Sequence, residues 1–298
     1  MSESGSSELA TDTFVAHRNL LFTVAYEIIG SAADAEDVIQ ETWLRWADVD
    51  VSQVRDQRAY LVRITTRQAL NRLRTLGRRK ESYIGQWLPE PILTAPDVAE
   101  DVELADSVST AMLLVLETLG PTERAVFVLR EVFEFGYSEI AEAVDKSPAA
   151  VRQIAHRART HVASRSPRAA VSPDESRHAR DAFQRALETG DLQSLFNILA
   201  PDIVALADGG GIKKAFPQPI FGADKVIRVM SSVPDEIWST SSYESVQING
   251  SEALIVRFNG EIDSAITFKV ADGWITEMYT VRNPEKLSHI ARETAISR

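Results

Sequence analysis

The stretch YSEIAEAVDKSPAAVRQIAHRARTHVASR, from Tyr137 to Arg165, decides how the middle of the chain folds. Its first third places apolar residues on one face of a short helix, namely Ile140, Ala141 and Val144. The triplet Asp145-Lys146-Ser147 then predicts a tight turn. Ser147 is a favourable N-cap and Pro148 suits the first position of a second helix, which we expect to run from Ala149 to about Ala163. The stretch therefore predicts a helix-turn-helix.

The second of these helices has an apolar stripe and a polar, basic face. The stripe consists of Val151, Ile154, Ala158 and Val162. A helix of this kind presents its N-terminal side chains to base edges while its arginines meet phosphates. The residues predicted to contact DNA are Ser147, Ala149, Arg152, Gln153, His156, Arg157 and Arg159. The alternative is an ordinary helical hairpin with a solvated basic face. Residues 147–168 contain no acid, however, and a merely solvated face usually mixes charges.

Charge is distributed unevenly along the 298 residues, whose formal net charge is -11. Local clustering matters more for nucleic-acid binding than the total. A second acid-free basic block runs from Gln57 to Lys80 and contains Arg58, Arg63, Arg67, Arg72, Arg74, Arg78, Arg79 and Lys80. The chain thus carries two basic segments within an acidic protein, and a DNA partner is compatible with its composition.

Composition also excludes several classes of protein. The chain has no cysteine, which excludes disulfides, thiolate metal sites and thiol redox switches, and no metal site or cofactor is predicted. No apolar run approaches the ~20 residues that span a bilayer, so no membrane partner is expected. The N-terminus MSESGSSELATDT lacks the basic start and apolar core of a signal peptide, and the expected location is cytoplasmic.

The order of predicted elements indicates a multidomain protein. Residues 9 to about 76 are predicted as three helices, with a break at Gly30-Ser31 and a third helix from Ala59 to about Leu76. Residues 81–103 are predicted as a linker, rich in proline but with an aromatic core at Tyr83–Pro91 that is too apolar for a solvated tether. Helical patterns return over residues 104–168. A second linker follows from Ser166 to Pro173.

The last segment, residues 174–298, is predicted as α+β. It opens with two helices, near Asp174–Thr189 and Leu192–Leu199. Three dipeptides then signal hairpin turns: Asn249-Gly250, Asn259-Gly260 and Asp272-Gly273. They separate four β-rich runs, which are Tyr243–Ile248, Ala253–Phe258, Ile262–Val270 and Trp274–Val281. We therefore expect helices followed by a meander of antiparallel strands.

Two helical segments resemble parts of bacterial sigma factors. The run from Asp34 to Trp43 resembles the region 2 helix that docks on the clamp of core RNA polymerase. The run from Arg58 to Arg74 resembles the segment that melts and reads the -10 promoter element, and Leu119–Phe127 with the helix-turn-helix resembles region 4, which reads the -35 element. Two helical domains joined by a short linker match the extracytoplasmic-function (ECF) class, in which residues 1–80 are region 2 and residues 104–168 are region 4.

This resemblance implies partners and site residues. The partners are promoter DNA and core RNA polymerase, through its beta-prime clamp and beta flap. The implied -10 residues are Arg58, Tyr60, Arg63, Arg67, Asn71 and Arg74. The implied polymerase-binding residues are Asp34, Asp37, Gln40, Glu41 and Trp43. Acids at this helix start also serve as N-terminal capping groups, and both roles can hold at once.

The C-terminal segment resembles the SnoaL-like branch of the NTF2-like fold, a cone of helices and curved sheet. Sigma factors with this fused extension form a group whose linker and extension carry paired motifs. The implied regulatory residues are Trp87, Leu88, Pro89, Glu90, Pro91, Asp208, Gly209, Gly210, Gly211, Lys213, Asn283 and Pro284. The resemblance implies that the extension tunes the activity of the sigma body, in place of a separate anti-sigma protein.

Other readings of the extension stay open at this stage. The residues around Gly209–Gly211 do not have the spacing of a phosphate-binding loop. A turn or a contact surface requires only that the glycines carry no side chain. Asp208 is the candidate general base, but residues 171–298 hold only two histidines, His178 and His289, so no catalytic residue and no enzyme activity are predicted. A small ligand in the C-terminal pocket remains an option. The competing function is a one-component DNA-binding regulator with a ligand-sensing C-terminal domain.

Overall fold

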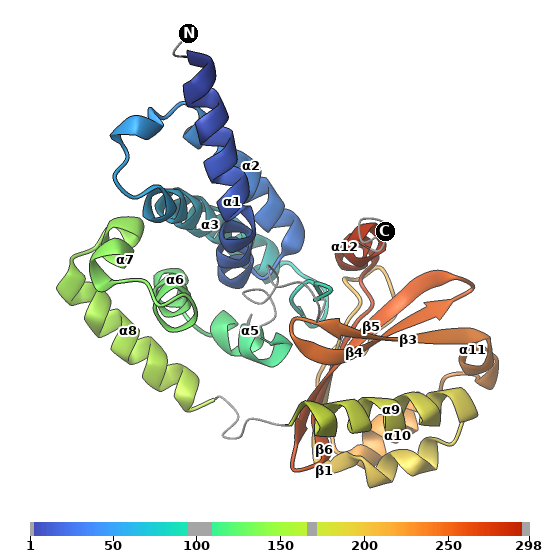
Figure 1. The fold of residues 1–298 in the computed structure, drawn as a ribbon. Helices are drawn as coiled ribbons and strands as arrows, with labels where there is room; N and C mark the ends of the chain where they lie inside the picture. The colour runs from blue at the N-terminus through green and yellow to red at the C-terminus, as the bar shows by residue number, and fades with distance from the viewer. Residues whose placement is uncertain (1–2, 95–108, 166–171, 294–298) are drawn as a thin grey trace. The chain divides into compact units, whose positions relative to one another are not determined.

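The computed structural model describes residues 3–94, 109–165 and 172–293, which form two compact units (Figure 1). One unit is helical and contains residues 3–81 and 112–165. The other contains residues 82–94, 109–111 and 172–293. The predicted linker residues 95–103 and the segment 166–171 lie outside the described residues. Among the described helices, none is long and apolar enough to cross a membrane.

The helical unit begins with three long helices that share a core. They are α1 (Glu3–Ile29), α2 (Ala32–Ala47) and α3 (Gln57–Glu81), with a short 3-10 helix, η1 (Val51–Gln53), before α3. The predicted break is confirmed, because Gly30 has a positive φ of 77° and the Ser31 side chain caps α2 by accepting from the Asp34 amide at 3.2 Å. The third helix is longer than predicted. It starts two residues early because Asp56 accepts from the Ala59 amide at 2.9 Å.

The predicted helix-turn-helix is confirmed at α7 (Tyr137–Val144) and α8 (Pro148–Ala163). Asp145 adopts a left-handed φ of 54° at the turn, and the Ser147 hydroxyl accepts from the Ala150 amide at 3.2 Å. Three short elements precede it: α5 (Thr110–Glu117), α6 (Pro121–Phe127) and the π-helical turn η2 (Val128–Val132). The buried Arg124 donates from Nε to the Glu27 carbonyl at 2.9 Å, which ties α6 to α1.

The C-terminal unit is built on one six-stranded sheet in the order β2-β1-β6-β5-β4-β3. Its strands are β1 (Leu199–Asp208), β2 (Ile220–Phe221), β3 (Ser241–Ile248), β4 (Ser251–Phe258), β5 (Glu261–Ala271) and β6 (Trp274–Val281). All neighbours are antiparallel except β1 and β6, which are parallel. One face carries the helices α9 (Pro173–Thr189) and α10 (Ala223–Met230), as Figure 1 shows for α9 and α10 beside the sheet.

Apolar side chains of these helices and strands form the main core of this unit. Phe183 of α9 is fully buried against Phe268 of β5, with ring centroids 4.9 Å apart. Ile227 of α10 and Leu254 of β4 belong to the same cluster. The remaining helices are the short 3-10 helix η3 (Leu192–Asn197), α11 (Asp235–Thr240) and α12 (Pro284–Glu293), the last of which packs against β5.

The sequence predicted the meander well and the first strands poorly. All three hairpin turns are confirmed, since Asn249, Asn259 and Asp272 have positive φ values of 50°, 53° and 51° and each precedes a glycine. The predicted helix at Leu192–Leu199 is wrong beyond Asn197, because Leu199 already begins β1. Strand β1 was not predicted. Its parallel pairing with β6 leaves no turn signal nearby, so only the three-dimensional structure reveals it.

Candidate functional site

Helix α8 exposes the predicted -35 residues on one continuous face. Its inner stripe is buried and consists of Val151, Ala155, Ala158 and Val162. The exposed predicted residues are Ser147, Ala149, Arg152, Gln153, His156, Arg157 and Arg159. Because a helix turns 100° per residue, Ala149, Gln153 and His156 lie at the centre of this face, with Arg152 and Arg159 at one margin and Arg157 at the other. The structure therefore brings the whole predicted set together.

Acids outside α8 pair with the marginal arginines. Arg159 makes two hydrogen bonds to the Glu131 carboxylate, at 3.0 and 2.6 Å, and this pairing raises the pKa of the Arg159 guanidinium. Arg157 lies 3.9 Å from Glu123 and remains largely exposed. These are surface pairs, so they contribute little to stability and can open when a polyanion competes.

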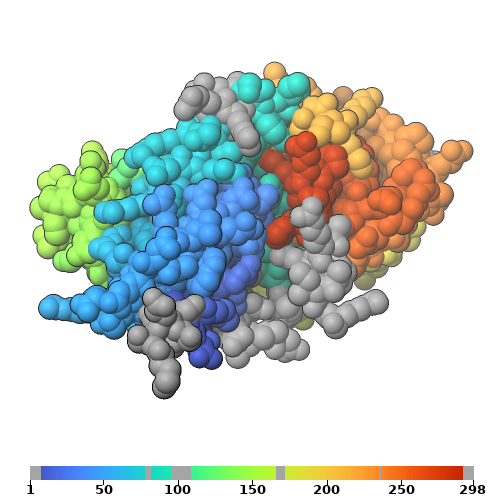
Figure 2. All heavy atoms as spheres, turned by 90° about the horizontal axis from the view of Figure 1, so that it is seen from above, coloured from blue at the N-terminus to red at the C-terminus, as the bar shows by residue number. Residues whose placement is uncertain are grey.

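Three of the predicted -10 arginines on α3 contact α7 or the residues just before it. Arg63 forms an ion pair with the Glu142 carboxylate at 3.0 Å, and Arg67 donates to the Glu142 backbone carbonyl at 2.8 Å. Arg58 stacks on the Phe135 ring, 4.6 Å from its centroid. In Figure 2 the green side chains of the α7–α8 region lie against the light-blue and cyan side chains of α3. In this state α7 occupies part of the predicted -10 surface.

The other predicted -10 residues take local partners. The Tyr60 ring packs near Trp46 with centroids 5.8 Å apart, and Arg63 also stacks over Tyr60 at 4.6 Å. Arg74 donates to the Asn71 side chain at 3.1 Å. The predicted residues therefore line one helix, but not all of them are free to meet DNA in this conformation.

Two of the predicted polymerase-binding acids on α2 form ion pairs with an arginine of α3. Arg72 of α3 donates to Asp34 and to Asp37, both at 2.6 Å. Burial lowers the pKa of Arg72, but the hydrogen bond to Asp34 and the surrounding carboxylates outweigh it, and the pKa is raised. Asp34 also accepts from the Ser31 hydroxyl at 2.7 Å, so it serves the helix start. Gln40 and Glu41 are exposed, while Trp43 is half-buried beside Phe14, with ring centroids 5.1 Å apart.

The linker motif and the extension motifs meet at Asp208, the last residue of β1. Asp208 is fully buried, and its two carboxylate oxygens accept four hydrogen bonds. The donors are the Tyr83 hydroxyl at 2.6 Å, the Gly210 amide at 3.0 Å, the Leu88 amide at 2.9 Å and the Lys286 ammonium at 2.7 Å. A carboxylate saturated in this way has no lone pair aimed at a substrate. The geometry therefore argues against the general base that the sequence allowed.

Lys286 completes this site from α12. Its ammonium also donates to the Leu88 carbonyl at 2.5 Å and lies over the Trp87 ring, 4.2 Å from the centroid. Burial, followed by the hydrogen bond to Asp208, raises the pKa of Tyr83, so Tyr83 stays a neutral donor. Asn283 donates to the Tyr83 hydroxyl at 2.9 Å and accepts from the Glu285 amide at 3.0 Å at the start of α12.

The three glycines after Asp208 allow other parts of the chain to lie close to their backbone. A Cβ on Gly209 would overlap with the Lys213 carbonyl, and a Cβ on Gly210 would overlap with the Asn283 amide. Gly210 and Gly211 have positive φ values of 62° and 74°. This arrangement agrees with a contact surface and contains no phosphate-loop geometry, because the glycine gaps are filled by the chain itself.

Lys213 does not join the Asp208 cluster, although the sequence grouped it with those residues. Its ammonium pairs with Asp263 of β5 at 2.9 Å, and Arg282 donates to both oxygens of the same carboxylate at 3.0 Å. Burial alone would raise the pKa of Asp263, but the hydrogen bonds and charges of Arg282 and Lys213 outweigh it and leave the pKa lowered. This second cluster fastens the glycine loop to the sheet.

The far end of the linker pairs with the edge of the sheet. The Thr94 amide donates to the Gln247 carbonyl at 3.0 Å, and the Asn249 amide donates to the Ile92 carbonyl at 3.0 Å. Leu93 forms a β-bridge with Ile248. Since β1 and β3 are separated by three strands, the segment from Tyr83 to Thr94 crosses the sheet between its two attachment points. The linker is thus a structural part of the C-terminal unit.

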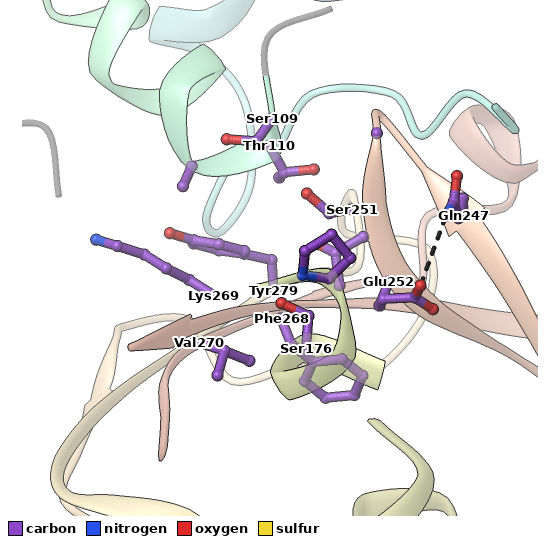
Figure 3. Close-up of a pocket in the computed structure, with 14 residues that line it drawn as sticks. Ser109, Thr110, Ser176, Gln247, Ser251, Glu252, Phe268, Lys269, Val270 and Tyr279 are labelled. Carbon is purple, nitrogen blue, oxygen red and sulfur yellow. Dashed lines mark hydrogen bonds between the residues drawn. The ribbon is translucent and has the colours of Figure 1, made fainter. Parts of the chain in front are cut away.

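A cavity of about 360 Å³ opens beside the first residues of α5 and α9, next to strands β4 and β5 (Figure 3). Its polar lining includes Thr110, Ser176, Ser251 and Lys269. Lys269 pairs with Glu277, which also accepts from the Tyr279 hydroxyl, and burial, then the charge of Glu277, raises the pKa of Tyr279. The space between the sheet and the helices α9 and α10 is filled by the apolar core cluster. No described group of three His, Cys, Asp or Glu residues has a metal-binding arrangement.

Sequence reasoning missed two central members of the linker site. Tyr83 and Lys286 were not among the predicted regulatory residues, although Tyr83 stands four residues before the predicted Trp87 and Lys286 two residues after the predicted Pro284. Tyr83 begins the aromatic core of the linker, and Lys286 ends the Asn283-Pro284-Glu285-Lys286 run. Their positions beside buried Asp208 could be anticipated only from the rule that a buried carboxylate requires a charged or hydrogen-bonding partner.

A helix-turn-helix with an exposed basic face, beside a second basic helix, defines a DNA-binding transcription factor. The Sigma-70 region 2 family matches residues 13–79, and the Sigma-70, region 4 family matches residues 109–162. The ECF RNA polymerase sigma factor SigJ of Mycobacterium tuberculosis is 32% identical over 295 residues, covering 92% of each chain. The probable ECF RNA polymerase sigma factor SigI of the same species is 30% identical over 283 residues, covering 93% of this chain and 94% of that one.

A solved structure agrees with these relatives. The crystal structure of M. tuberculosis SigJ superposes with a TM-score of 0.76 at 30% identity, covering 94% of this chain and 98% of that chain. The chain belongs to the ECF RNA polymerase sigma factors. It is an alternative sigma factor for transcription initiation, a class that binds core RNA polymerase and promoter DNA, and its C-terminal unit is an α+β fold built on a six-stranded sheet.

Proposed function

We propose that this sigma factor reads the -10 element with α3 and the -35 element with α8, while its own C-terminal domain sets its activity through the linker. Core polymerase binds the exposed residues of α2, through the beta-prime clamp, and region 4 meets the beta flap. The buried contact between Asp208 and Lys286 carries the regulatory part of the proposal, because it fastens the chain that joins the two promoter-reading parts. Release of that chain changes the tether between them.

The energetics favour an all-or-none attachment. Breaking a buried ion pair by removing one partner costs about 3–5 kcal/mol, since the remaining charge stays desolvated. Asp208 also satisfies the Leu88 amide, whose exposure without a partner would cost a further ~1–3 kcal/mol. The linker therefore has a docked state held by several coupled contacts and a released state in which they are lost together.

The test compares Asp208→Asn and Lys286→Met with the exposed control Asp202→Asn on the same strand. Full-length variants are mixed with core polymerase, and run-off transcription is measured on a promoter selected by the wild type. We expect the first two variants to change transcription several-fold and to speed hydrogen exchange at the Leu88 amide, with no change in the control. Unchanged transcription together with faster exchange would contradict regulation by the linker.

Two further parts of the proposal have their own measurements. The extension acts in place of a separate anti-sigma protein and has no catalytic role, as saturation of Asp208 supports. Affinity purification of the full chain from its native cell extract should recover core polymerase subunits. Stoichiometric recovery of a small anti-sigma protein would overturn the first statement, and turnover of a small molecule by the purified chain would overturn the second.

The competing function is a one-component regulator whose C-terminal domain senses a small molecule. The cavity beside Thr110 and Lys269 is the observation that favours it. Such a regulator binds operator DNA tightly without polymerase. The sigma factor is expected to bind free duplex weakly and to gain promoter selectivity only with core polymerase, so a binding assay with and without core polymerase separates the two functions.

A further inference from the structure

The charged side chains that line the cavity beside α5 and α9 already have partners of opposite charge. Lys269 of β5 forms an ion pair with Glu277 of β6, and Glu252 of β4 forms one with Arg180 of α9. Arg177 lies 3.8 Å from the same Glu252 carboxylate. A charged ligand would compete with these ion pairs, whereas an uncharged ligand would leave them intact.

The hydroxyl groups of the lining are available to a ligand. Thr267 of β5 is only 5% exposed and lies opposite Tyr279 of β6 in the sheet register, and both residues line the cavity (Figure 3 labels Tyr279). A threonine buried to this extent normally has its hydroxyl hydrogen-bonded. Within the part of the chain that the structure describes, the Thr267 hydroxyl makes no hydrogen bond, and neither do the hydroxyls of Ser176 and Ser251, which line the same cavity.

Apolar groups complete the lining between these hydroxyls. They are supplied by Phe268 and Val270 of β5 and by Pro173 at the start of α9. A hydroxyl offers one donor and two acceptor positions, so it pairs well with another hydroxyl, while apolar side chains suit C–H groups. The volume of about 360 Å³ is near the lower end of the range of roughly 300–1,000 Å³ that small-molecule pockets have. The lining and the volume thus fit a small molecule that carries several hydroxyl groups.

We propose that this cavity binds a small, uncharged, polyhydroxylated molecule of about the size of a single sugar ring. The hydroxyls of Thr267, Ser251 and Ser176 hydrogen-bond to the hydroxyls of the ligand. The apolar side chains lie against its C–H groups. The site is separate from the cluster around Asp208, whose carboxylate is already saturated with hydrogen bonds.

The turn that borders the cavity also holds the linker and the start of α5. Gly250 lines the cavity, and its amide donates to the Thr94 hydroxyl at 3.0 Å. Asn249 donates from Nδ2 to the Thr110 hydroxyl at 3.2 Å and accepts from the Ile92 amide at 3.3 Å. Because a ligand stabilises the state that it binds, the bound molecule favours the docked linker. This step rests on the proposed function, in which the docked linker sets the activity of the sigma factor.

The experiment titrates the full-length chain with three uncharged probes, D-glucose, myo-inositol and glycerol, and with inorganic phosphate as the charged probe. We expect calorimetry to show saturable binding of at least one uncharged probe and no binding of phosphate. Hydrogen exchange at the Thr94 amide, which donates to the Gln247 carbonyl, should slow in the presence of that probe. At a probe concentration of ten times Kd, the rate should fall by up to about tenfold if only the docked state binds.

Three variants test the lining residues. Thr267→Val keeps the shape of the side chain and removes only its hydroxyl, so it should weaken binding of the probe about 2- to 12-fold, the value of one hydrogen bond, without lowering the thermal midpoint. Ser251→Ala should act in the same direction. The matched control is Thr280→Val, because Thr280 is half-buried in β6 next to Tyr279 but points to the opposite face of the sheet. Its affinity for the probe should equal that of the wild type.

The outcomes separate this inference from the proposed function. The site is overturned if none of the uncharged probes binds, if phosphate binds more tightly than they do, or if Thr267→Val and Ser251→Ala both keep full affinity. Binding without any change in exchange at the Thr94 amide would overturn the coupling to the linker. Failure of the proposed function gives a different result, namely that Asp208→Asn leaves transcription unchanged although the linker exchanges faster, whether or not a probe binds.

Discussion

The Glu142 carboxylate of α7 lies 3.0 Å from the Arg63 guanidinium of α3, although the two residues are far apart in the sequence. The same residue accepts from Arg67 through its backbone carbonyl at 2.8 Å. A helix predicted for -35 recognition thus engages two arginines predicted for -10 recognition. Under the proposed function, α7 and -10 DNA compete for the same arginines of α3, so α3 reads the -10 element only after α7 has left it.

Glu142→Gln is expected to strengthen binding of single-stranded -10 DNA. The variant removes the ion pair, which as an exposed contact contributes about 0.2–1 kcal/mol, so affinity should rise by up to about fivefold at low salt. Fluorescence anisotropy with a labelled oligonucleotide measures the effect. Glu134→Gln removes an equal charge from an exposed acid with no described ion pair, and it should change affinity less. Equal changes in both variants would mean that net charge alone matters.

Gly210→Ala is expected to destabilise the C-terminal unit more than an equivalent change in an open turn. Gly210 and Gly260 both have positive φ, so alanine costs roughly 1–2 kcal/mol of strain at either position. At Gly210 the new methyl group also meets the Asn283 amide, whereas Gly260 has open space. Chemical denaturation should show a loss for Gly210→Ala at least about 1 kcal/mol larger than for Gly260→Ala. Similar losses would show that Asn283 moves freely.

Asp263→Asn is expected to reduce stability at neutral pH and to have little effect in acid. The folded-state pKa of Asp263 is lowered by Arg282 and Lys213, so its stabilising effect is complete above the unfolded pKa of about 4 and disappears as the pH falls through the folded pKa. Loss of charged hydrogen bonds should cost about 1–3 kcal/mol at pH 7. The difference in the free energy of unfolding between wild type and variant should shrink below about pH 4.

Asp272→Asn is the matched control for the pH experiment. Asp272 is exposed at a turn with φ 51°, and asparagine suits that position equally well. Its variant removes the same charge without touching the cluster around Asp263. A pH-independent difference for Asp263→Asn, or an equal one for Asp272→Asn, would mean that the ion pairs do not stabilise the glycine loop.

Ser147→Ala is expected to lower the stability of the helix-turn-helix by about 0.5–2 kcal/mol, because the Ser147 hydroxyl caps α8 through the Ala150 amide. Ser147→Asp keeps an acceptor at that position and should restore most of the loss. Thermal unfolding followed by circular dichroism measures both variants. If Ser147→Asp is as unstable as Ser147→Ala, the cap does not stabilise α8.

The parts of the fold that were predictable have local physical causes. The three hairpin turns were visible because Asn-Gly and Asp-Gly pairs tolerate positive φ, and α8 was visible because its apolar residues repeat with helical spacing. Strand β1 was not predictable, since its partner β6 lies far along the chain and no hairpin turn signal stands beside β1 in the sequence. Local pattern cannot identify a long-range parallel partner.

The candidate sites also differ in how far local sequence predicts them. The residues of α8 share one helix, so their common face follows from spacing alone. The partners of Asp208 come from the linker, from the glycine loop and from α12, and no local rule brings these together. Arg63 and Glu142 likewise meet only through tertiary packing. Sequence motifs named several of the residues that meet at Asp208 without indicating which of them touch.

Under the proposed function, the docked linker also limits how far the two promoter-reading parts can separate. Residues 82–94 belong at once to the C-terminal unit and to the covalent connection between α3 and α5. While these residues are held at Asp208 and at the edge of β3, they add no free length to the connection between α3 and α5. Released and fully extended, the same stretch would span about 40 Å. Under the proposed function, release of residues 82–94 from the C-terminal unit lengthens the chain available between α3 and α5, so the protein itself would set the spacing between -10 and -35 elements that it accepts.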